Sequence, residues 1–432
     1  MKKEKNENIE EKLYKLAYID KVTNIENNNF FLEKGTELLK QQFEGYLLLI
    51  DVGKFKIFNK KYGRIIGDSL LKNIGKKLKE ILGEKRIITR LANDVFAVIL
   101  EEKEQKELTQ IVEKLLKELS NIEVEKNKYK ILISIGISKI EKEDKDIFEI
   151  LDKAIIARDE AKKNFNKKYH IFNQELENQI IKEHDIELIM EEGIQNQEFK
   201  VFYQPKVNAK NEKVEEAEAL VRWERENKLI PPNEFIPVFE KNKFIIQLDK
   251  YIYEQVCKDM KEWKEKYNKK IKVSVNISKQ HIVQDGFIEE YYKITKKYNV
   301  NPNEIELEIT ETTELDEQFG ISKILENLKE KGFKISIDDF GTGYSSLSML
   351  QQIPVDVIKI DKSFVDQIKM LEIMILIAKK MDLKTVAEGV ETNEQVQILK
   401  NLEVDLLQGF YYSKPLEKTE FEKYWQNNWQ KL

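Results

Sequence analysis

The sequence predicts two α/β domains in series: an amino-terminal α+β domain of ferredoxin-like or palm-type order and a carboxy-terminal modified TIM-type (β/α) barrel. The length of 432 residues exceeds what one ordinary core holds. Over residues 46–173 the apolar runs indicate strand, helix, hairpin, helix and strand, in that order. From about residue 198, roughly eight apolar strands recur, mostly separated by helical stretches, over a length close to the ~250 residues of a TIM barrel.

The elements of the amino-terminal domain follow from their hydrophobic period. Short apolar runs rich in β-branched residues indicate strands, and apolar residues three or four positions apart indicate helices. Only Ala92, Asn93 and Asp94 separate two of the strands, so these two form a hairpin. The predicted elements are strand 46–53 (YLLLIDVG), helix 70–82, strands 86–91 and 95–101, helix 108–119, strand 130–138, helix 150–163 and strand 169–173.

The barrel strands are predicted in the same way, and the first two have no helix between them, so that part of the barrel is expected to be irregular. A charged stretch without proline, and without glycine before Gly193, predicts a helical connector before the barrel. The expected divisions are a helical lead 1–17, a first domain 18–173, a connector 174–195 and a barrel 196–432. The predicted barrel strands are 200–207, 215–223, 271–278, 304–310, 333–340, 355–361, 383–390 and 406–410.

The composition excludes several classes of protein. Lysine plus arginine (73) nearly balance aspartate plus glutamate (78), and a net charge of −5 argues against a general nucleic-acid binder. Cys257 is the single cysteine, which excludes an internal disulfide and favours a reducing compartment. No signal peptide is recognised, and the longest apolar runs are far shorter than the ~20 residues that span a bilayer. A cytoplasmic protein without a membrane partner is expected.

Polar residues follow the apolar runs of the predicted barrel strands, where the chemistry of such barrels lies. A single acid there could be a structural ion pair, and the pair Asp338-Asp339 in SIDDFGTGYSSL could simply cap a turn. Five carboxylates and one amide on one rim instead suit Mg²⁺ or Mn²⁺, and a shared carboxylate suits a two-metal phosphoryl site. The polar residues expected at the carboxyl ends of the strands are Gln204, Glu218, Arg222, Asn276, Glu308, Asp338, Asp339, Lys359, Glu388 and Gln408.

Residues 198–430 resemble the EAL family of cyclic-di-GMP phosphodiesterases. The family signature stands here as Glu218-Ala219-Leu220-Val221-Arg222-Trp223. Seven further motifs accompany it, and together they are far more specific than the signature alone. They are YQPK (203–206), VSVNIS (273–278), LEITE (307–311), DDFGTGYSSL (338–347), IKID (358–361), AEGVE (387–391) and QGF (408–410).

The resemblance implies hydrolysis of cyclic-di-GMP to linear 5'-pGpG with two Mg²⁺ or Mn²⁺ ions. Lys359 would orient and activate the attacking water, with Glu388 and Glu218 also counted as catalytic, and Glu311 would anchor the loop after Asp339. One ion would be held by Glu218, Asn276, Glu308 and Asp338, and the other by Asp338, Asp339 and Glu388. The dinucleotide would be faced by Gln204, Arg222, Gln408 and Glu391.

Residues 18–173 resemble the GGDEF diguanylate cyclase domain, with an altered signature. The stretch DVGKFKIFNKKYGRIIGDSLL (51–71) keeps the family pattern, but the hairpin reads Ala92-Asn93-Asp94-Val95-Phe96. A Cβ at positions 92 and 93 obstructs the approach of a triphosphate, and Val95 has no lone pair for a metal. We therefore expect a catalytically inactive domain.

Further departures in this domain point the same way. Gly53 stands where the family has a second acid, and Asn166 where it has an arginine. Asp51, Asn59 and Asp68 remain as candidate GTP-binding residues, which would make GTP an effector, although a polar helix surface explains Asn59 and Asp68 equally well.

Two alternatives to the phosphodiesterase stay open from the sequence. A non-catalytic cyclic-di-GMP receptor could use the same barrel, but it has no need of the metal ligands or Lys359, all of which are present. A bifunctional cyclase and phosphodiesterase is disfavoured by Val95. The resemblance also implies a homodimer through the EAL domain. The segment after Phe364 is shorter than usual near the family's dimer contacts, so a monomer and a homodimer both stay open.

Overall fold

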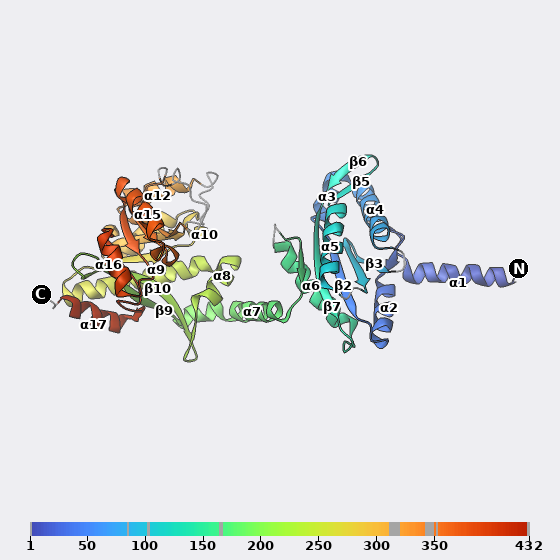
Figure 1. Cartoon of the computed structure of the whole chain (residues 1–432), viewed down its shortest axis with the longest axis horizontal. Coiled ribbons are helices and arrows are strands. Elements are labelled where there is room, and N and C mark those ends of the chain that lie inside the picture. The colour runs from blue at the N-terminus through green and yellow to red at the C-terminus, as the bar shows by residue number, and fades with distance from the viewer. Residues whose placement is uncertain are drawn as a thin grey trace. The chain divides into compact units, whose positions relative to one another are not determined.

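The computed structural model describes residues 2–429 apart from 84–85, 102–103, 164–166, 311–319, 342–349 and 351–352, with side chains from residue 9 to residue 428. The chain divides into two compact units, Met1–Ile181 and Lys182–Leu432, and each is described by itself (Figure 1). In the described ranges, no helix is both long enough and apolar enough to cross a lipid bilayer.

A six-stranded sheet forms the centre of the first unit, in the order β1-β3-β4-β2-β7-β8. Its four inner strands are antiparallel, and their order β3-β4-β2-β7 is that of the predicted ferredoxin-like fold. The strands are β1 (Glu26–Asn27), β2 (Gly45–Gly53), β3 (Ile87–Ala92), β4 (Val95–Leu100), β7 (Leu132–Ile140) and β8 (Tyr169–Ile171), with a separate hairpin of β5 (Asn121–Val124) and β6 (Asn127–Lys130).

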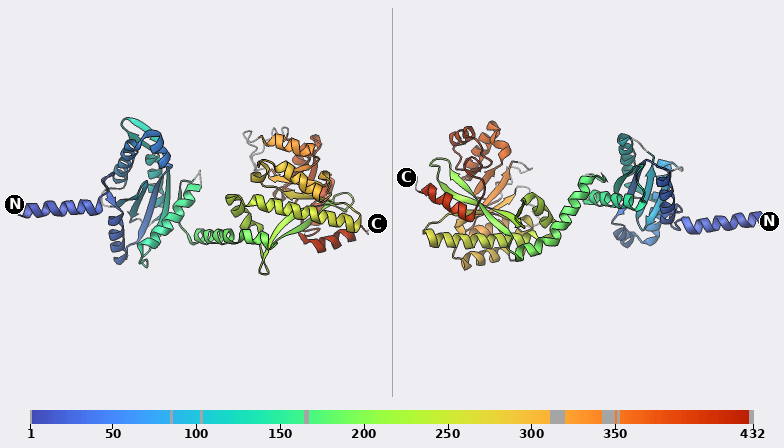
Figure 2. Two further views of the ribbon diagram at one scale, coloured as in Figure 1. Left: turned by 180° about the vertical axis from the view of Figure 1, so that it is seen from behind. Right: turned by 90° about the horizontal axis from the view of Figure 1, so that it is seen from below.

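Helices cover both faces of this sheet because β2 is apolar on both sides. The helices of this unit lie on both sides of the sheet (Figure 2). Leu48 and Ile50 pack in a core with α4 and α5, whereas Leu47 and Leu49 pack in a second core with α2 and α6. The sequence prediction omitted α2, α3 and the β5–β6 hairpin. The helices are α1 (Lys2–Tyr18), α2 (Asn28–Lys40), α3 (Phe55–Tyr62), α4 (Arg64–Leu82), α5 (Gln105–Leu119) and α6 (Ile147–Lys163).

The second unit is a closed barrel, which confirms the predicted fold class. β10 and the strands from β12 to β17 run parallel, whereas β9 is antiparallel both to β10 and to β17 and closes the barrel between them. The strands are β9 (Phe199–Asn208), β10 (Val214–Arg225), β11 (Lys228–Ile230), β12 (Lys272–Asn276), β13 (Ile305–Thr310), β14 (Lys334–Phe340), β15 (Val357–Ile360), β16 (Lys384–Ala387), β17 (Leu406–Leu407) and β18 (Leu416–Glu417).

The helices between the strands cover the outside of the barrel (Figure 1). The α7 helix (Gln174–Gln195) leads into it, and Gly193 lies so close to Phe199 and Trp223 that a Cβ would come within about 3.1 Å of both side chains. The remaining helices are α8 (Pro232–Asn242), α9 (Ile245–Tyr267), α10 (Lys279–Ile282), η1 (Pro302–Glu304), α11 (Phe287–Lys297), α12 (Ile321–Glu330), α14 (Lys362–Val365), α15 (Ile368–Lys380), α16 (Asn393–Asn401) and α17 (Lys418–Trp429).

Candidate active site

Acidic side chains from neighbouring parallel strands meet at one rim of the barrel. The strand register sets Asn276 beside Glu308 and Thr310 beside Asp338. Two groups of carboxylates have ligand atoms within 4.8 Å of one another, and they share Asp338. The first group is Glu218, Glu308 and Asp338, and the second is Asp338, Asp339 and Glu388.

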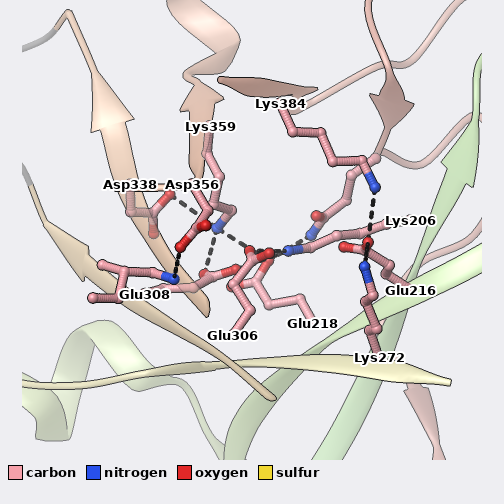
Figure 3. Close-up of polar contacts among 12 residues, drawn as sticks. Lys206, Glu216, Glu218, Lys272, Glu306, Glu308, Asp338, Asp356, Lys359 and Lys384 are labelled. Carbon is pink, nitrogen blue, oxygen red and sulfur yellow. Dashed lines mark hydrogen bonds and ion pairs between the residues drawn. The ribbon is translucent and has the colours of Figure 1, made fainter. Parts of the chain in front are cut away.

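Lys359 lies among these carboxylates and is only 1% exposed. Its Nζ is 2.6 Å from Glu308 Oε2, 2.9 Å from Asp338 Oδ1 and 3.4 Å from Glu218 Oε2 (Figure 3). It is also 2.7 Å from Glu388 Oε1. Burial alone would lower the pKa of Lys359, but these carboxylates outweigh burial and raise it well above the ordinary value. The side chain is therefore a charged ammonium, which can donate a hydrogen bond but cannot accept a proton.

The two adjacent aspartates reach the same rim because β14 is irregular where they occur. The register with β15 shifts between Ile337 and Phe340, and Asp339 has a left-handed backbone with φ of 54°. In a regular strand, neighbouring side chains would point to opposite faces. The bulge allows both carboxylates to join the second group.

Amide side chains hold Glu218 from two sides. Asn276 Nδ2 donates to Glu218 Oε1 (3.0 Å), and Gln408 Nε2 donates to Glu218 Oε2 (2.6 Å). Gln408 Nε2 also donates to Gln204 Oε1 (3.0 Å). Gln204 was expected at the carboxyl end of its strand, and that expectation is wrong. Because β9 runs against its neighbours, Gln204 lies in the middle of β9, in register with Glu218.

The carboxylates of the rim differ in their protonation. Burial would raise the pKa of Glu308, but Lys206 and Lys359 outweigh burial and lower it to about 2. Burial raises the pKa of Glu388 to about 8, where Lys359 opposes the shift and Asp338 adds to it. The rim therefore holds one firmly ionised carboxylate and one that keeps its proton at neutral pH.

Two cavities adjoin the rim. One, of about 310 Å³, is lined by Gln204, Glu218, Lys359, Glu391 and Gln408, among others. The other, of about 470 Å³, is largely apolar and is lined by Arg222 and Asn276. Arg222 lies over the Phe202 ring, at 5.9 Å from its centroid, and Glu391 forms an ion pair with Lys362. Glu311 lies outside the described residues.

Sequence reasoning missed two charged residues that the structure places next to the rim. Lys206, the last residue of YQPK, and Glu306 on β13 are both buried and form an ion pair of 3.2 Å. The signal was present in the alternation of the strands, because Lys206 is two residues from Gln204 and Glu306 is two residues from Glu308.

The altered hairpin and the candidate GTP-binding residues of the first unit form no comparable cluster of carboxylates among the described residues. Asp51 is buried, and Lys162 Nζ lies 2.7 Å from its Oδ2. Burial raises the pKa of Asp94, and the charge of Asp51 adds to the shift. Asn59 is half-buried on α3 and Asp68 is exposed on α4. The Asn59 Oδ1 atom lies where a Cβ at position 67 would stand, so a larger residue in place of Gly67 would displace the Asn59 side chain.

The fold and the rim define a (β/α)-barrel protein with a carboxylate-rich candidate metal site at the carboxyl ends of its parallel strands. The chain belongs to the EAL domain family, which matches residues 188–415. The diguanylate cyclase GGDEF domain family matches residues 17–168, so a GGDEF domain precedes the EAL domain, as the resemblance indicated.

Known proteins resemble this chain over almost its whole length. The signaling protein YkoW of Bacillus subtilis is 31% identical over 96% of this chain and 54% of its own length. The bifunctional diguanylate cyclase/cyclic di-GMP phosphodiesterase MucR of Pseudomonas aeruginosa is 29% identical over 94% of this chain and 61% of its own length. A solved structure of the PaMucR phosphodiesterase in complex with c-di-GMP has a TM-score of 0.53 and 31% identity, covering 55% of this chain and 99% of that one. The chain thus spans little more than half the length of these curated relatives.

Proposed function

We propose that this chain is a phosphodiesterase that hydrolyses c-di-GMP to linear 5'-pGpG with two divalent cations, Mg²⁺ or Mn²⁺. The observation that carries the proposal is the pair of carboxylate groups that share Asp338, with Lys359 among them. The relatives support the substrate, since MucR is named as a c-di-GMP phosphodiesterase and the PaMucR structure contains c-di-GMP.

The residues of the rim suit this reaction. Glu218, Asn276, Glu308 and Asp338 would hold one cation, and Asp338, Asp339 and Glu388 the other. The oxygen ligands are those that Mg²⁺ and Mn²⁺ prefer. Two such cations supply a hydroxide-like nucleophile and neutralise charge on the phosphate oxygens. Lys359, as an ammonium, would orient the attacking water by donating a hydrogen bond to it.

Substrate contacts are proposed for the polar residues beside the rim. Gln204 and Gln408 line the smaller cavity with Glu391, and Arg222 lines the larger one. The Arg222 guanidinium has the forked geometry that phosphate oxygens accept. The apolar walls of the larger cavity suit a base of the dinucleotide.

The decisive experiment incubates the purified chain with c-di-GMP and either Mg²⁺ or Mn²⁺, with EDTA as the control, and follows the products by chromatography. We expect pGpG in the presence of metal and none with EDTA. Binding of c-di-GMP without any product, with both metals, would instead identify a receptor.

Metal binding should depend on pH through Glu388. The pKa of the Glu388 carboxyl is raised to about 8 in the folded protein. The contribution of this carboxyl to the stability of the fold is therefore present below its pKa in the unfolded chain, near 4.5, and is lost as pH rises through 8. A metal ligand must lose its proton, so metal affinity should rise up to about tenfold per pH unit between pH 6 and 8, with release of a proton. Calorimetry with Mn²⁺ in buffers of different ionisation enthalpy measures both effects, and a flat affinity over this range would contradict the prediction.

The GGDEF domain is proposed to be an inactive cyclase with a regulatory role, in which GTP acts as an effector if it binds. Ala92 and Asn93 carry side chains at the exposed turn, and Asp51 is already paired with Lys162. In an Asp338→Asn background, where hydrolysis is blocked, we expect no c-di-GMP to form from GTP and Mg²⁺. As a control, c-di-GMP added to this variant should persist, which shows that hydrolysis is blocked. Accumulation of c-di-GMP from GTP would refute the proposal.

A homodimer through the EAL domain is also proposed. The α15 helix exposes four large apolar side chains, Ile368 (45%), Met370 (46%), Ile373 (52%) and Leu376 (57%). We expect Ile373→Lys to convert a dimer to a monomer in light scattering, whereas Glu265→Lys, at an exposed position on α9, should not. A monomeric parent chain at micromolar concentration would rule the dimer out.

A further inference from the structure

A fully buried lysine lies in the barrel next to the rim. Lys206 on β9 has no exposed surface, and its Nζ donates to Glu308 Oε1 (2.9 Å) and to Glu306 Oε1 (3.2 Å) (Figure 3). An ammonium inside a protein is costly unless it is paired. One carboxylate would suffice for neutrality, yet Lys206 contacts two, and one of these belongs to the first carboxylate group of the rim.

The two oxygens of Glu308 have different neighbours. Oε1 accepts from Lys206, whereas Oε2 accepts from Lys359 at 2.6 Å, on the side of the other rim carboxylates. The side chain is 1% exposed, so it has no solvent in which to turn. Lys206 therefore fixes which oxygen of Glu308 faces the rim.

We propose that Lys206 is a positioning residue for the metal site. It holds Oε1, so that Glu308 would offer a cation only Oε2, and its charge offsets part of the negative charge at the rim. The inference rests on the proposed function. In the competing explanation, Lys206 and Glu306 are only a structural pair that neutralises the interior of the barrel.

The test is Lys206→Met in the full chain, because methionine has similar length and no charge. We expect Mn²⁺, measured without substrate by calorimetry or electron paramagnetic resonance, to bind about tenfold more tightly or better, since a nearby buried cation has been removed. Turnover at saturating metal should fall about tenfold, because Glu308 Oε1 has lost its partner and would compete with Oε2 for the cation. Damage to a merely structural pair would weaken Mn²⁺ binding, so unchanged or weaker binding in the folded variant overturns the proposal.

A second variant separates position from charge. Lys206→Met combined with Glu306→Gln removes one charge of each sign, so we expect Mn²⁺ affinity to stay within about threefold of the parent while turnover remains reduced about tenfold. If the single variant does not fold, this double variant decides, and parental turnover in it overturns the proposal. The matched control is Lys384→Met, which removes a lysine paired at 2.8 Å with another buried glutamate, Glu216, and should change neither quantity.

Measurements on the parent chain separate failure of the proposed function from failure of the positioning role. If it binds no Mn²⁺ and cleaves no c-di-GMP, the proposed function fails. If it does both, but Lys206→Met behaves as the parent does, only the positioning role fails.

Discussion

Replacing Lys359 with methionine should lower phosphodiesterase turnover by about 10³-fold, a loss typical of removing a group that positions a proton-transfer partner. The ammonium contacts four carboxylates at 2.6–3.4 Å. Among the described residues, it is the only cationic group that contacts all four of them. The variant keeps every proposed metal ligand, so Mn²⁺ should still bind while the attacking water is badly oriented.

The same variant should lose stability in the absence of metal, because four acids remain around an uncharged side chain. A bound cation would restore the positive charge that the ammonium places among the carboxylates. Mg²⁺ should therefore raise the melting temperature of the variant more than that of the parent. Lys334→Met, which removes a lysine paired with Asp356 at 2.9 Å, serves as the control. Turnover within about tenfold of the parent would remove Lys359 from the mechanism.

Replacing Glu218 with glutamine should lower turnover for a different reason, the loss of a metal ligand. Both Glu218 oxygens accept hydrogen bonds from amides, Asn276 Nδ2 at 3.0 Å and Gln408 Nε2 at 2.6 Å. A glutamine amide would face one of these donors with a donor of its own, which leaves a buried polar group unpaired. We expect metal affinity to fall about 10- to 100-fold and turnover at least as much.

Glu216→Gln is the matched control for this experiment. Glu216 lies two residues earlier on the same strand, is equally buried, and pairs with Lys384 and Lys272 instead of the rim (Figure 3). The control should retain the parent's metal affinity. Equal losses in the two variants would mean that the Glu218 effect reflects general damage to the barrel, and retained turnover in Glu218→Gln would exclude it as a ligand.

The sequence predicted the fold well because both sheets have strong local patterns. The run YLLLID is apolar on both faces, and it forms a strand covered on both faces. The α2 and α3 helices were not predicted, since each buries few residues: Phe31, Gly35 and Leu39 in α2, and Phe55 in α3. Contacts with the sheet, which no local period shows, stabilise such helices.

The site was predictable where residues follow strands and less so where the backbone departs from regularity. The rim acids could be placed from their positions after apolar runs. The direction of β9, which moves Gln204 to the middle of a strand, depends on pairing with β10 and with β17, some 200 residues away. The bulge that brings Asp338 and Asp339 to one rim depends likewise on β15. Lys206 was missed because a lysine is assumed to be solvated unless its neighbours are known.

The way in which the barrel closes has a consequence for its synthesis. β9, the first barrel strand to be made, pairs on one side with β10, but its other partners are β17 and β18, which end at Glu417. Until these residues leave the ribosome, the nascent barrel has an open seam, with the free edges of β9 and β16 exposed to other chains. Chaperones that shield such edges should matter more for this protein than for one whose sheet is completed early. Stalled or truncated chains that lack β17 and β18 are expected to aggregate.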